Sequence, residues 1–222
     1  MRSERDAKAI LAAYGIPTPR EVLAGTAAEA ARGARSIGFP VVLKACGPTL
    51  AHKSDLGLVR VGLGSAAEVR AAHRAITEAA TDAGLALDGV LVAEQVTDGV
   101  ETVVGVAPDP LFGPVVMVGL GGVFVEVLRD VAFRVPPFGR DEARRMLTEL
   151  RGFPLLAGAR GRPPADVGAL VDVVLRVQRL ALDLDGELVE LDLNPLLVRP
   201  KGRGAVALDA LAVPGRGASA RQ

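Results

Sequence analysis

The hydrophobic positions of this chain follow two spacings, which predict strands and helices in alternation. Short apolar runs predict strands at residues 40–46, 58–63, 89–96, 101–107, 114–119 and 129–135. Apolar residues three and four positions apart predict helices at residues 5–14, 141–151 and 166–183. In the last helix we expect one buried face, formed by Val167, Leu170, Val171, Val174, Val177 and Ala181.

Two further helices are predicted from their first residues. The segments Thr26 to Glu29 and Ser65 to Glu68 have the spacing of a capping box, in which a hydroxyl and a glutamate accept free N–H groups at a helix start. An Ala-rich run follows each segment, so we expect a helix to begin at each of them.

Oxygen-bearing side chains alternate with leucines near the C-terminal end of the chain. Glu190, Asp192 and Asn194 occupy every second position, so a strand would place all three on one face. Leu196 to Arg199 and Ala205 to Asp209 flank Lys201-Gly202, which is a plausible hairpin turn.

A turn centred on Lys201-Gly202 would set Asn194 opposite Asp209, with about 5 Å between their Cβ atoms. Mg²⁺ typically takes one or two carboxylate or amide oxygens and completes its shell with water and phosphate oxygens. Asn194 and Asp209 are therefore a candidate Mg²⁺ pair. The alternative is an edge hairpin whose polar face meets water.

Composition excludes several classes of function. The 222 residues carry 26 basic and 26 acidic side chains, which argues against nucleic acid or an anionic membrane as the main partner. One cysteine, Cys46, rules out an internal disulfide framework and indicates the reducing cytoplasm. The charged start, Met1 to Asp6, lacks the pattern of a signal peptide. The uncharged run Pro110 to Val125 is too short to span a bilayer, so no membrane partner is expected.

Two lysines lie close together in a chain whose basic residues are mostly arginine. Lys44 ends the apolar run from Phe39, and Lys53 lies in the glycine-bearing loop beyond it. Ammonium groups in that setting, with backbone N–H groups of such a loop, suit phosphate oxygens. We expect the Lys44 ammonium to face a nucleotide cleft, so that its removal would change stability little. The alternative is a lysine reaching from a strand end into solvent beside an ordinary polar loop.

Two known phosphate-binding patterns are rejected. Residues 47–54 nearly match G-x-x-x-x-G-K-[ST], but His52 replaces the second glycine and a predicted strand follows where that motif opens a helix. Residues 62–67 match the looser dinucleotide pattern G-x-G-x-x-A, but Arg60 interrupts the strand before it. A nicotinamide or flavin site is not expected here.

An ordered set of short motifs resembles the ATP-grasp subunit of ADP-forming acyl-CoA synthetases, with succinyl-CoA synthetase β subunits as more distant relatives. The resemblance covers about Arg5 to Val213 and rests on residues 39–44, 52–55, 92–96, 101, 112–114, 119–122, 130–134 and 190–195. It implies an α+β protein with the ATP-grasp fold, in which two lobes clamp ATP. We expect the lobes at 21–95 and 96–213, after an N-terminal helix and link at 1–20 and before a disordered tail at 214–222.

The resemblance also implies the residues of the nucleotide site. It assigns phosphate binding to a strand lysine, adenine binding to a linker between the lobes, and ribose binding to an acid. The implied nucleotide contacts are Lys44, Lys53, Ser54, Glu94, Gln95, Val96, Glu101, Gly121 and Gly122, and the implied Mg²⁺ ligands are Asn194 and Asp209.

In such enzymes a phosphohistidine relays phosphate between the nucleotide and an acyl-CoA site, which a partner α subunit or domain largely builds. The family's H-K-[ST]-D histidine falls on His52, and Arg134 falls among the phosphate or relay contacts. Nearby cations favour the neutral imidazole that attacks phosphorus. The alternative for His52 is a loop histidine that bonds the backbone. The other histidine, His73, is expected on the surface.

The chain departs from the family at Leu58, where a second glycine is usual. Leucine there would stiffen the loop, which affects relay competence more than nucleotide binding. Asp192 is ambiguous, since on the same strand face it could be a metal ligand, a support for the ligands or a solvated acid.

Together these observations predict the nucleotide-binding subunit of an acid–CoA ligase that uses ATP/ADP and Mg²⁺ with a CoA-binding α subunit. The overall reaction is acyl-CoA + ADP + phosphate ⇌ carboxylic acid + CoA + ATP, and the stretch Pro110 to Val125 is expected to contact the partner. One alternative is a non-catalytic nucleotide-sensing module associated with a protein acyltransferase. Another is an ATP-grasp ligase making an acyl-phosphate for an amine, in which a relay histidine has no role. Phosphorylation of His52 by Mg-ATP separates the synthetase from the sensing module.

Overall fold

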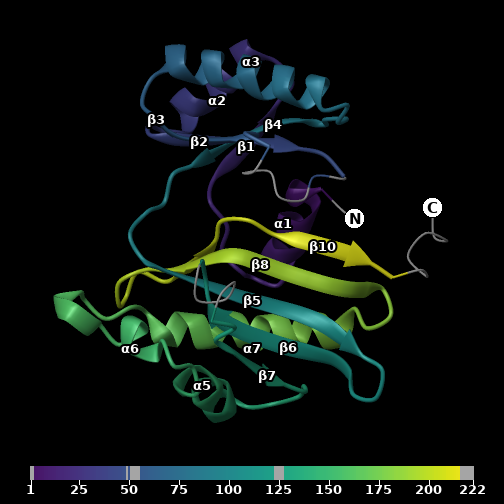
Figure 1. Ribbon diagram of the computed structural model, residues 1–222, viewed down its shortest axis with the longest axis vertical. Helices are drawn as coiled ribbons and strands as arrows, with labels where there is room; N and C mark the ends of the chain where they lie inside the picture. The colour runs from purple at the N-terminus through teal and green to yellow at the C-terminus, as the bar shows by residue number, and fades with distance from the viewer. Residues whose placement is uncertain (1–2, 49, 51–55, 123–127, 216–222) are drawn as a thin grey trace. The chain divides into compact units, whose positions relative to one another are not determined.

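The structure, a computed structural model, describes residues 3–48, 50, 56–122 and 128–215. The chain divides into two compact units, and each has its own sheet and hydrophobic core (Figure 1). Unit 1 comprises residues 1–6 and 19–96, and unit 2 comprises residues 7–18 and 97–222.

Unit 1 is built on a four-stranded antiparallel sheet in the order β1-β4-β2-β3. Helices α2 and α3 cover one face of this sheet (Figure 1). On β2, Val41, Leu43 and Ala45 are buried in that core, so Lys44 projects from the opposite face because side chains alternate along a strand. The elements are β1 (Glu21–Ala24), α2 (Ala27–Ile37), β2 (Val41–Cys46), β3 (Val59–Leu63), α3 (Ala66–Asp82) and β4 (Gly89–Glu94).

Both predicted helix starts in unit 1 are confirmed. Thr26 and Glu29 form a complete capping box, in which each side chain accepts the backbone N–H of the other residue at 3.2 Å. The Ser65 hydroxyl accepts the N–H of Glu68 at 3.2 Å, but the Glu68 carboxylate accepts the N–H of Gly64 instead of that of Ser65. The same local chemistry therefore starts both helices, with a one-residue shift in the second.

Unit 2 is built on an antiparallel sheet in the order β10-β8-β5-β6-β7, with β9 pairing beside β10 on β8. Helices α5 and α7 lie against one face (Figure 1), and we call the face away from these two helices the open face. The elements are β5 (Val100–Asp109), β6 (Gly113–Leu120), β7 (Val131–Arg134), α5 (Arg140–Thr148), α6 (Phe153–Leu156), the 3₁₀ helix η1 (Ala159–Gly161), α7 (Val167–Asp183), β8 (Leu188–Val198), β9 (Ala205–Ala207) and β10 (Leu211–Pro214).

The amphipathic pattern predicted for the long C-terminal helix is confirmed. Helix α7 buries Leu170, Val171, Val174, Val177 and Ala181 in the core of unit 2, and Val167 packs at its edge. Helix α1 (Glu4–Ala13) adds Ala7 and Leu11 to the same core. Its first residues, through Asp6, belong to unit 1.

The register predicted for the C-terminal hairpin is also confirmed. β8 pairs with β9 at Leu196↔Ala207 and with β10 at Asp192↔Leu211, and both pairs fit a single register in which Asn194 lies opposite Asp209. The predicted strand to Asp209 is wrong in one respect, because residues 208–210 leave the ladder between β9 and β10. Asp209 thus lies in a gap between two strands.

The backbone N–H groups of the hairpin turn are bound by the Asp166 carboxylate, which lies outside the hairpin. Asp166 caps α7 by accepting the N–H of Ala169 at 3.1 Å, and its other oxygen accepts the N–H groups of Gly202 at 2.9 Å and Gly204 at 3.0 Å. Gly202 has φ +84°, which glycine adopts at little cost in the third position of a turn. Asp166 therefore links the start of α7 to the turn that sets the register.

Asp166→Ala is expected to lower the free energy of unfolding by roughly 1–3 kcal/mol, because three N–H groups lose their acceptor. Burial opposes ionisation, but the N–H groups of Gly204, Ala169 and Gly202 outweigh it and hold the pKa of Asp166 below its ordinary value. Because the pKa of Asp166 is lower in the folded than in the unfolded state, its ionised carboxylate stabilises the fold at pH values above the unfolded pKa. This stabilisation is lost as the pH falls through the folded pKa. The free energy of unfolding, measured with urea at about pH 7 and pH 3, should differ less between Asp166→Ala and wild type at pH 3 than at pH 7. The exposed Asp185→Ala is the control, and an equal effect of both variants would contradict the role of Asp166.

Strand β1, helix α6, the 3₁₀ helix η1 and strand β10 were not predicted from the sequence. Strand β1 has four residues and only one buried side chain, α6 is a single turn that begins at Phe153-Pro154, and β10 resumes pairing after a break. Each is shorter than the periodic window on which prediction depends.

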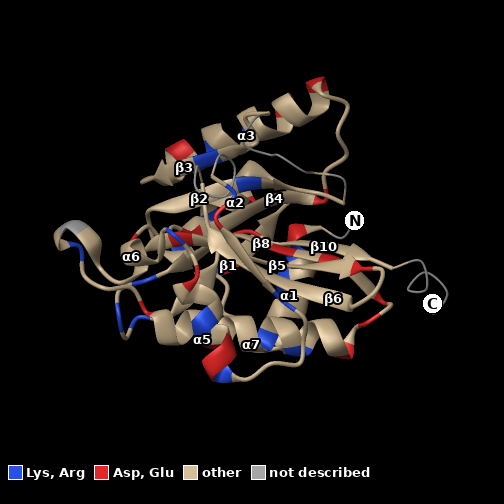
Figure 2. Cartoon of the chain, turned by 60° about the horizontal axis from the view of Figure 1, so that its bottom comes forward, with Lys and Arg blue, Asp and Glu red and all other residues tan. Residues whose placement is uncertain are grey.

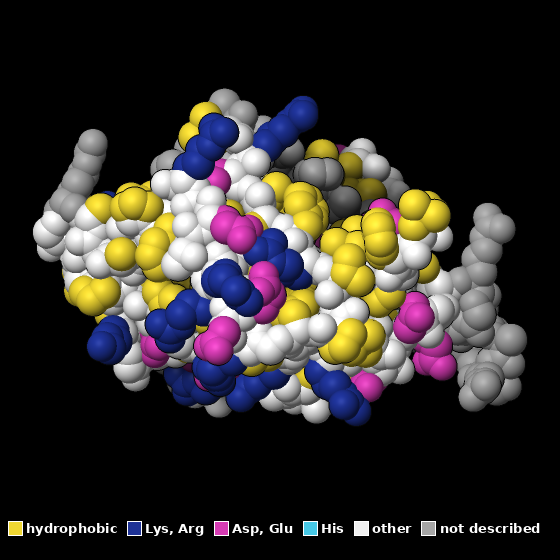
Figure 3. All heavy atoms as spheres, turned by 90° about the horizontal axis from the view of Figure 1, so that it is seen from below, with side chains coloured by type: hydrophobic (Ala, Val, Ile, Leu, Met, Phe, Trp, Pro, Cys, Tyr) yellow, Lys and Arg dark blue, Asp and Glu magenta, His cyan; other side chains and the backbone are white. Residues whose placement is uncertain are grey.

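Charges of both signs are interspersed on the surface. Figure 2 shows acidic and basic residues along α5 and α7, where Arg140 pairs with Asp172 and Arg179 with Asp183. On the face shown in Figure 3, basic, acidic and hydrophobic side chains lie side by side. None of the helices in the described ranges has the length and apolar content needed to cross a bilayer.

Candidate functional site

Lys44, the predicted phosphate-binding lysine, lies in the middle of the unit 1 sheet. Its Cα pairs with Val59 of β3 and with Leu91 of β4. Its ammonium lies 3.2 Å from Oε1 of Glu4, and the two side chains are 12% and 3% exposed. Because a buried acid is paired with Lys44, its removal is now expected to lower stability as well as phosphate binding. Sequence reasoning missed Glu4, which no motif indicates.

The predicted adenine linker begins where β4 ends. The Glu94 carboxylate pairs with Arg20 at 3.0 Å, and the Gln95 side-chain oxygen accepts the N–H of Gly62 at 2.7 Å. Val96 is the last residue of unit 1. These contacts tie the start of the linker to β3 and to Arg20, the residue before β1. Recognition of a base by the linker backbone stays a prediction.

The predicted relay loop lies largely outside the described residues, and His52, Lys53 and Ser54 are among those not described. Leu58, where the family resemblance departs, is fully buried in the core of unit 1. Its carbonyl accepts the N–H of Ala45 at 3.0 Å. Leucine therefore anchors the end of the loop in the core, which a glycine at this position would not do.

His73 is not a surface residue, and that expectation is wrong. It is 6% exposed, and its Nε2 lies 3.4 Å from the carbonyl oxygen of Ala24. Val69 and Ile76 lie on the same buried face of α3, so His73 follows the helical period of the core despite its arginine neighbours.

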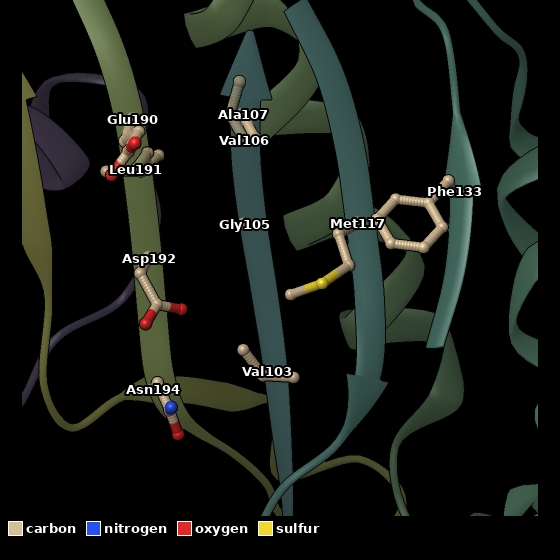
Figure 4. A pocket seen from close by; sticks show the side chains of 10 residues that line it. All are labelled: Val103, Gly105, Val106, Ala107, Met117, Phe133, Glu190, Leu191, Asp192 and Asn194. Atoms are coloured by element: carbon tan, nitrogen blue, oxygen red, sulfur yellow. The ribbon is translucent and has the colours of Figure 1, made fainter. Parts of the chain in front are cut away.

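The open face of the unit 2 sheet carries a hollow of about 310 Å³ beside the oxygen-bearing strand. Four strands place Asp192, Gly105, Met117 and Phe133 in one row across the sheet, through the pairs Gly105↔Asp192, Gly105↔Met117 and Met117↔Phe133. Figure 4 shows the side chains of Asp192 and Asn194 on β8, with those of Met117 and Phe133 on the strands beyond Gly105. Gly105 has no side chain, and a Cβ there would approach Met117 and Leu191. The hollow therefore has an oxygen-rich side and an apolar side.

Negative charge is concentrated on the oxygen-rich side. Burial, followed by the negative charges of Asp209 and Glu190, raises the pKa of Asp192, a hydrogen bond with Asn194 lowers it, and the net pKa is about 6. The predicted pair and Asp192 are thus close enough to influence one another. Asp209 also accepts the N–H of Ala210 at 2.8 Å, which orients its carboxylate.

Asn194 and Asp209 fit a hard cation that is shared with a ligand. Both present side-chain oxygens, which Mg²⁺ prefers. Within the described ranges no group of three His, Cys, Asp or Glu side chains is placed to hold a metal alone. Since Mg²⁺ usually keeps water and binds substrate phosphates, a partial protein shell is the arrangement expected for a nucleotide-bound ion.

Glu101, Gly121 and Gly122, which are predicted nucleotide contacts, line one hollow. The N–H of Gly121 donates to the Glu101 carbonyl at 2.9 Å, and all three residues line a second hollow of about 330 Å³ in unit 2. Leu155 and Arg162 complete its other side, and neither was singled out from the sequence. Two residues that follow α5 in the chain therefore line the same hollow as the three predicted contacts.

Arg134, predicted among the phosphate or relay contacts, is engaged by two carboxylates. Its guanidinium pairs with Glu149 and, at 2.7 Å, with Glu142 on α5. The hydrogen bonds with Glu149 and then Glu142 raise the pKa of Arg134. This arrangement supports a structural link between β7 and α5, and its phosphate role stays a prediction.

Comparison with known proteins gives one family. Residues 1–213 match the ATP-grasp domain. The β subunit of acetate–CoA ligase (ADP-forming) II from Pyrococcus furiosus is 45% identical, over 93% of this chain and 89% of that protein. Acetyl-coenzyme A synthetase 1 of Ca. Korarchaeum cryptofilum, in complex with coenzyme A, Ca-AMPCP and HgCl⁺, superposes with a TM-score of 0.92 at 43% identity, over 96% of this chain and 93% of that one. A second structure of that synthetase, with coenzyme A and Mg-AMPPCP and its phosphohistidine segment pointing towards the nucleotide binding site, gives a TM-score of 0.83 at 43% identity, over 95% and 91% of the two chains.

Proposed function

The chain belongs to the ATP-grasp family, among the nucleotide-binding β subunits of ADP-forming acyl-CoA synthetases, and we propose that it transfers phosphate between ATP and a phosphohistidine relay. The overall reaction of the synthetase is acyl-CoA + ADP + phosphate ⇌ carboxylic acid + CoA + ATP. In the step assigned to this chain, the bond between the γ-phosphorus and its bridging oxygen breaks as a bond from imidazole nitrogen to phosphorus forms. ADP leaves, and the reverse step makes ATP.

The observation that carries the proposal is the oxygen pair on the open face of unit 2. Asn194 and Asp209 lie opposite each other in the hairpin register, and Asn194 and Asp192 line the hollow on that face. Bound Mg²⁺ would neutralise the charge of the nucleotide phosphates. Asn194 and Asp209 would hold the ion, Lys44 would contact phosphate oxygens, and Glu101 would bind the ribose.

A partner supplies the acyl-CoA site in this proposal. The relative from Pyrococcus furiosus is named a β subunit, which implies a second subunit in that enzyme. We assign CoA binding to an α subunit or domain and its contact to residues within Pro110 to Val125. Leu111 and Phe112, at the turn between β5 and β6, are 87% and 62% exposed and support that contact. The free, buried Cys46 supports a cytoplasmic setting.

Asp209→Asn is expected to weaken Mg-ATP binding about tenfold or more while the fold stays intact, because it removes a charged ligand and keeps the acceptor for Ala210. Calorimetry with Mg-ATP, and with ATP in the presence of a chelator, measures the effect. Wild type and variant should bind metal-free ATP alike.

Glu190→Gln is the matched control, since Glu190, like Asp209, acts electrostatically on Asp192 but is not a predicted ligand. It is expected to change Mg-ATP affinity much less than Asp209→Asn does. If Asp209→Asn binds Mg-ATP as tightly as wild type, the metal assignment is wrong.

A further inference from the structure

We propose that Glu4 is a positioning residue for the nucleotide site, because it holds the Lys44 ammonium in the orientation that meets the phosphates. The proposal rests on the phosphate role assigned to Lys44 above. Glu4 begins α1, forty residues before Lys44, and lies in none of the motifs that indicate the nucleotide site.

The two ends of the lysine side chain are fixed in different ways. Its Cα is held between two neighbouring strands, through Lys44↔Val59 and Lys44↔Leu91. Its Nζ lies 3.2 Å from Glu4 Oε1, where the Glu4 side chain is only 3% exposed. Between those ends lies a four-carbon stem with many rotamers, so the carboxylate removes freedom that phosphate binding would otherwise have to remove.

A lysine ammonium can donate to more than one acceptor at once. It has three N–H donors, and the hydrogen bond to Glu4 takes one of them. Protein kinases use the same device, in which a glutamate on a helix pairs with the strand lysine that contacts ATP phosphates. Here a helix glutamate and a strand lysine meet in the same way within unit 1.

The pair lies among other buried residues, so its charges interact more strongly than charges at the surface do. Ser3 is 5% exposed, and Cys46, two residues from Lys44 on β2, is also buried. Burial raises the pKa of the Cys46 thiol, and the negative charge of Glu4 raises it further. A buried carboxylate lowers the stability of the fold unless a cation pairs with it, and Lys44 supplies that cation for Glu4.

The test compares Glu4→Gln with Asp6→Asn. Both acids lie in the first turn of α1, so each variant loses the same favourable interaction with the helix N-terminus, but Asp6 is exposed and is not paired with Lys44. We expect Glu4→Gln to weaken ATP binding by roughly five- to tenfold and to leave adenosine binding unchanged. Asp6→Asn should change neither affinity. A merely structural Glu4 would change both ligands alike or neither, and that result would overturn the proposal.

A double-variant cycle with Lys44→Met separates this inference from the proposed function. In the Lys44→Met background, Glu4→Gln should cost no further ATP affinity, because the group that it positions is gone. A full additional loss there would overturn the positioning role. If Lys44→Met itself binds ATP with wild-type affinity, the phosphate role of Lys44 is wrong. If Lys44→Met binds ATP weakly but Glu4→Gln binds it with wild-type affinity, only the positioning role of Glu4 is wrong. Glu4→Asp keeps the charge on a shorter stem, and if Glu4→Gln does not fold, this variant should still show weaker ATP binding with adenosine binding intact.

Discussion

Replacing His52 by alanine is expected to abolish acid-labile phosphate on the chain after incubation with Mg-ATP. Loss of a covalent nucleophile removes the intermediate itself, so phosphate exchange between ATP and ADP should fall by more than about a thousandfold. ATP affinity should stay within about twofold of wild type, because Lys44 and the Asn194–Asp209 pair are unchanged. Labelled ATP followed by peptide mapping measures the phosphate, and calorimetry measures the affinity.

The control is His73→Ala, since the chain has two histidines. His73 is buried beside Ala24, so its loss should lower stability while the folded protein still becomes phosphorylated. Unchanged exchange in His52→Ala would exclude the relay. Tight Mg-ATP binding by wild type without phosphate on His52 would instead favour the nucleotide-sensing module.

Lys44→Ala is expected to lose both stability and nucleotide affinity. Removal of one partner of a buried ion pair costs up to about 3–5 kcal/mol, because the buried Glu4 carboxylate loses its ion pair with Lys44. The lost hydrogen bond to a phosphate should cost about 1.5–3 kcal/mol of ATP affinity. Urea unfolding without nucleotide measures the first effect and calorimetry on the folded variant the second.

Lys201→Ala is the control for Lys44, because Lys201 is exposed in the hairpin turn. Its stability should stay within about 0.5 kcal/mol of wild type. A Lys44→Ala protein as stable as wild type would contradict the buried pair. A variant that is unstable but binds ATP normally would show that Lys44 is structural only.

The metal pair is the part of the candidate site that local sequence determined most fully. Alternation put Glu190, Asp192 and Asn194 on one face, and the turn at Lys201-Gly202 set Asn194 opposite Asp209, as the strand pairing confirms. Both rules act over a few residues and depend only on backbone geometry. The helix starts at Thr26 and Ser65 were predictable for the same reason.

Local rules also failed where the environment came from elsewhere in the chain. His73 looked exposed between two arginines, yet the face of α3 that it shares with Val69 packs into the core of unit 1. The strand that was expected to reach Asp209 breaks at residues 208–210, although its register continues in β10. Burial and breaks in a ladder depend on which segments pack together, and no window of a few residues contains that information.

The residue types that could bind phosphate and metal were predictable from the sequence, because strand alternation, capping and turn chemistry are local and the family motifs occur in a fixed order. The surroundings of those residues depend on tertiary packing. It placed Glu4 against Lys44, and it brought Asp192, Gly105, Met117 and Phe133 into one row from four strands. These contacts join residues far apart in the chain, and their energies come from burial and charge pairing, which arise only when the core and the sheets have formed.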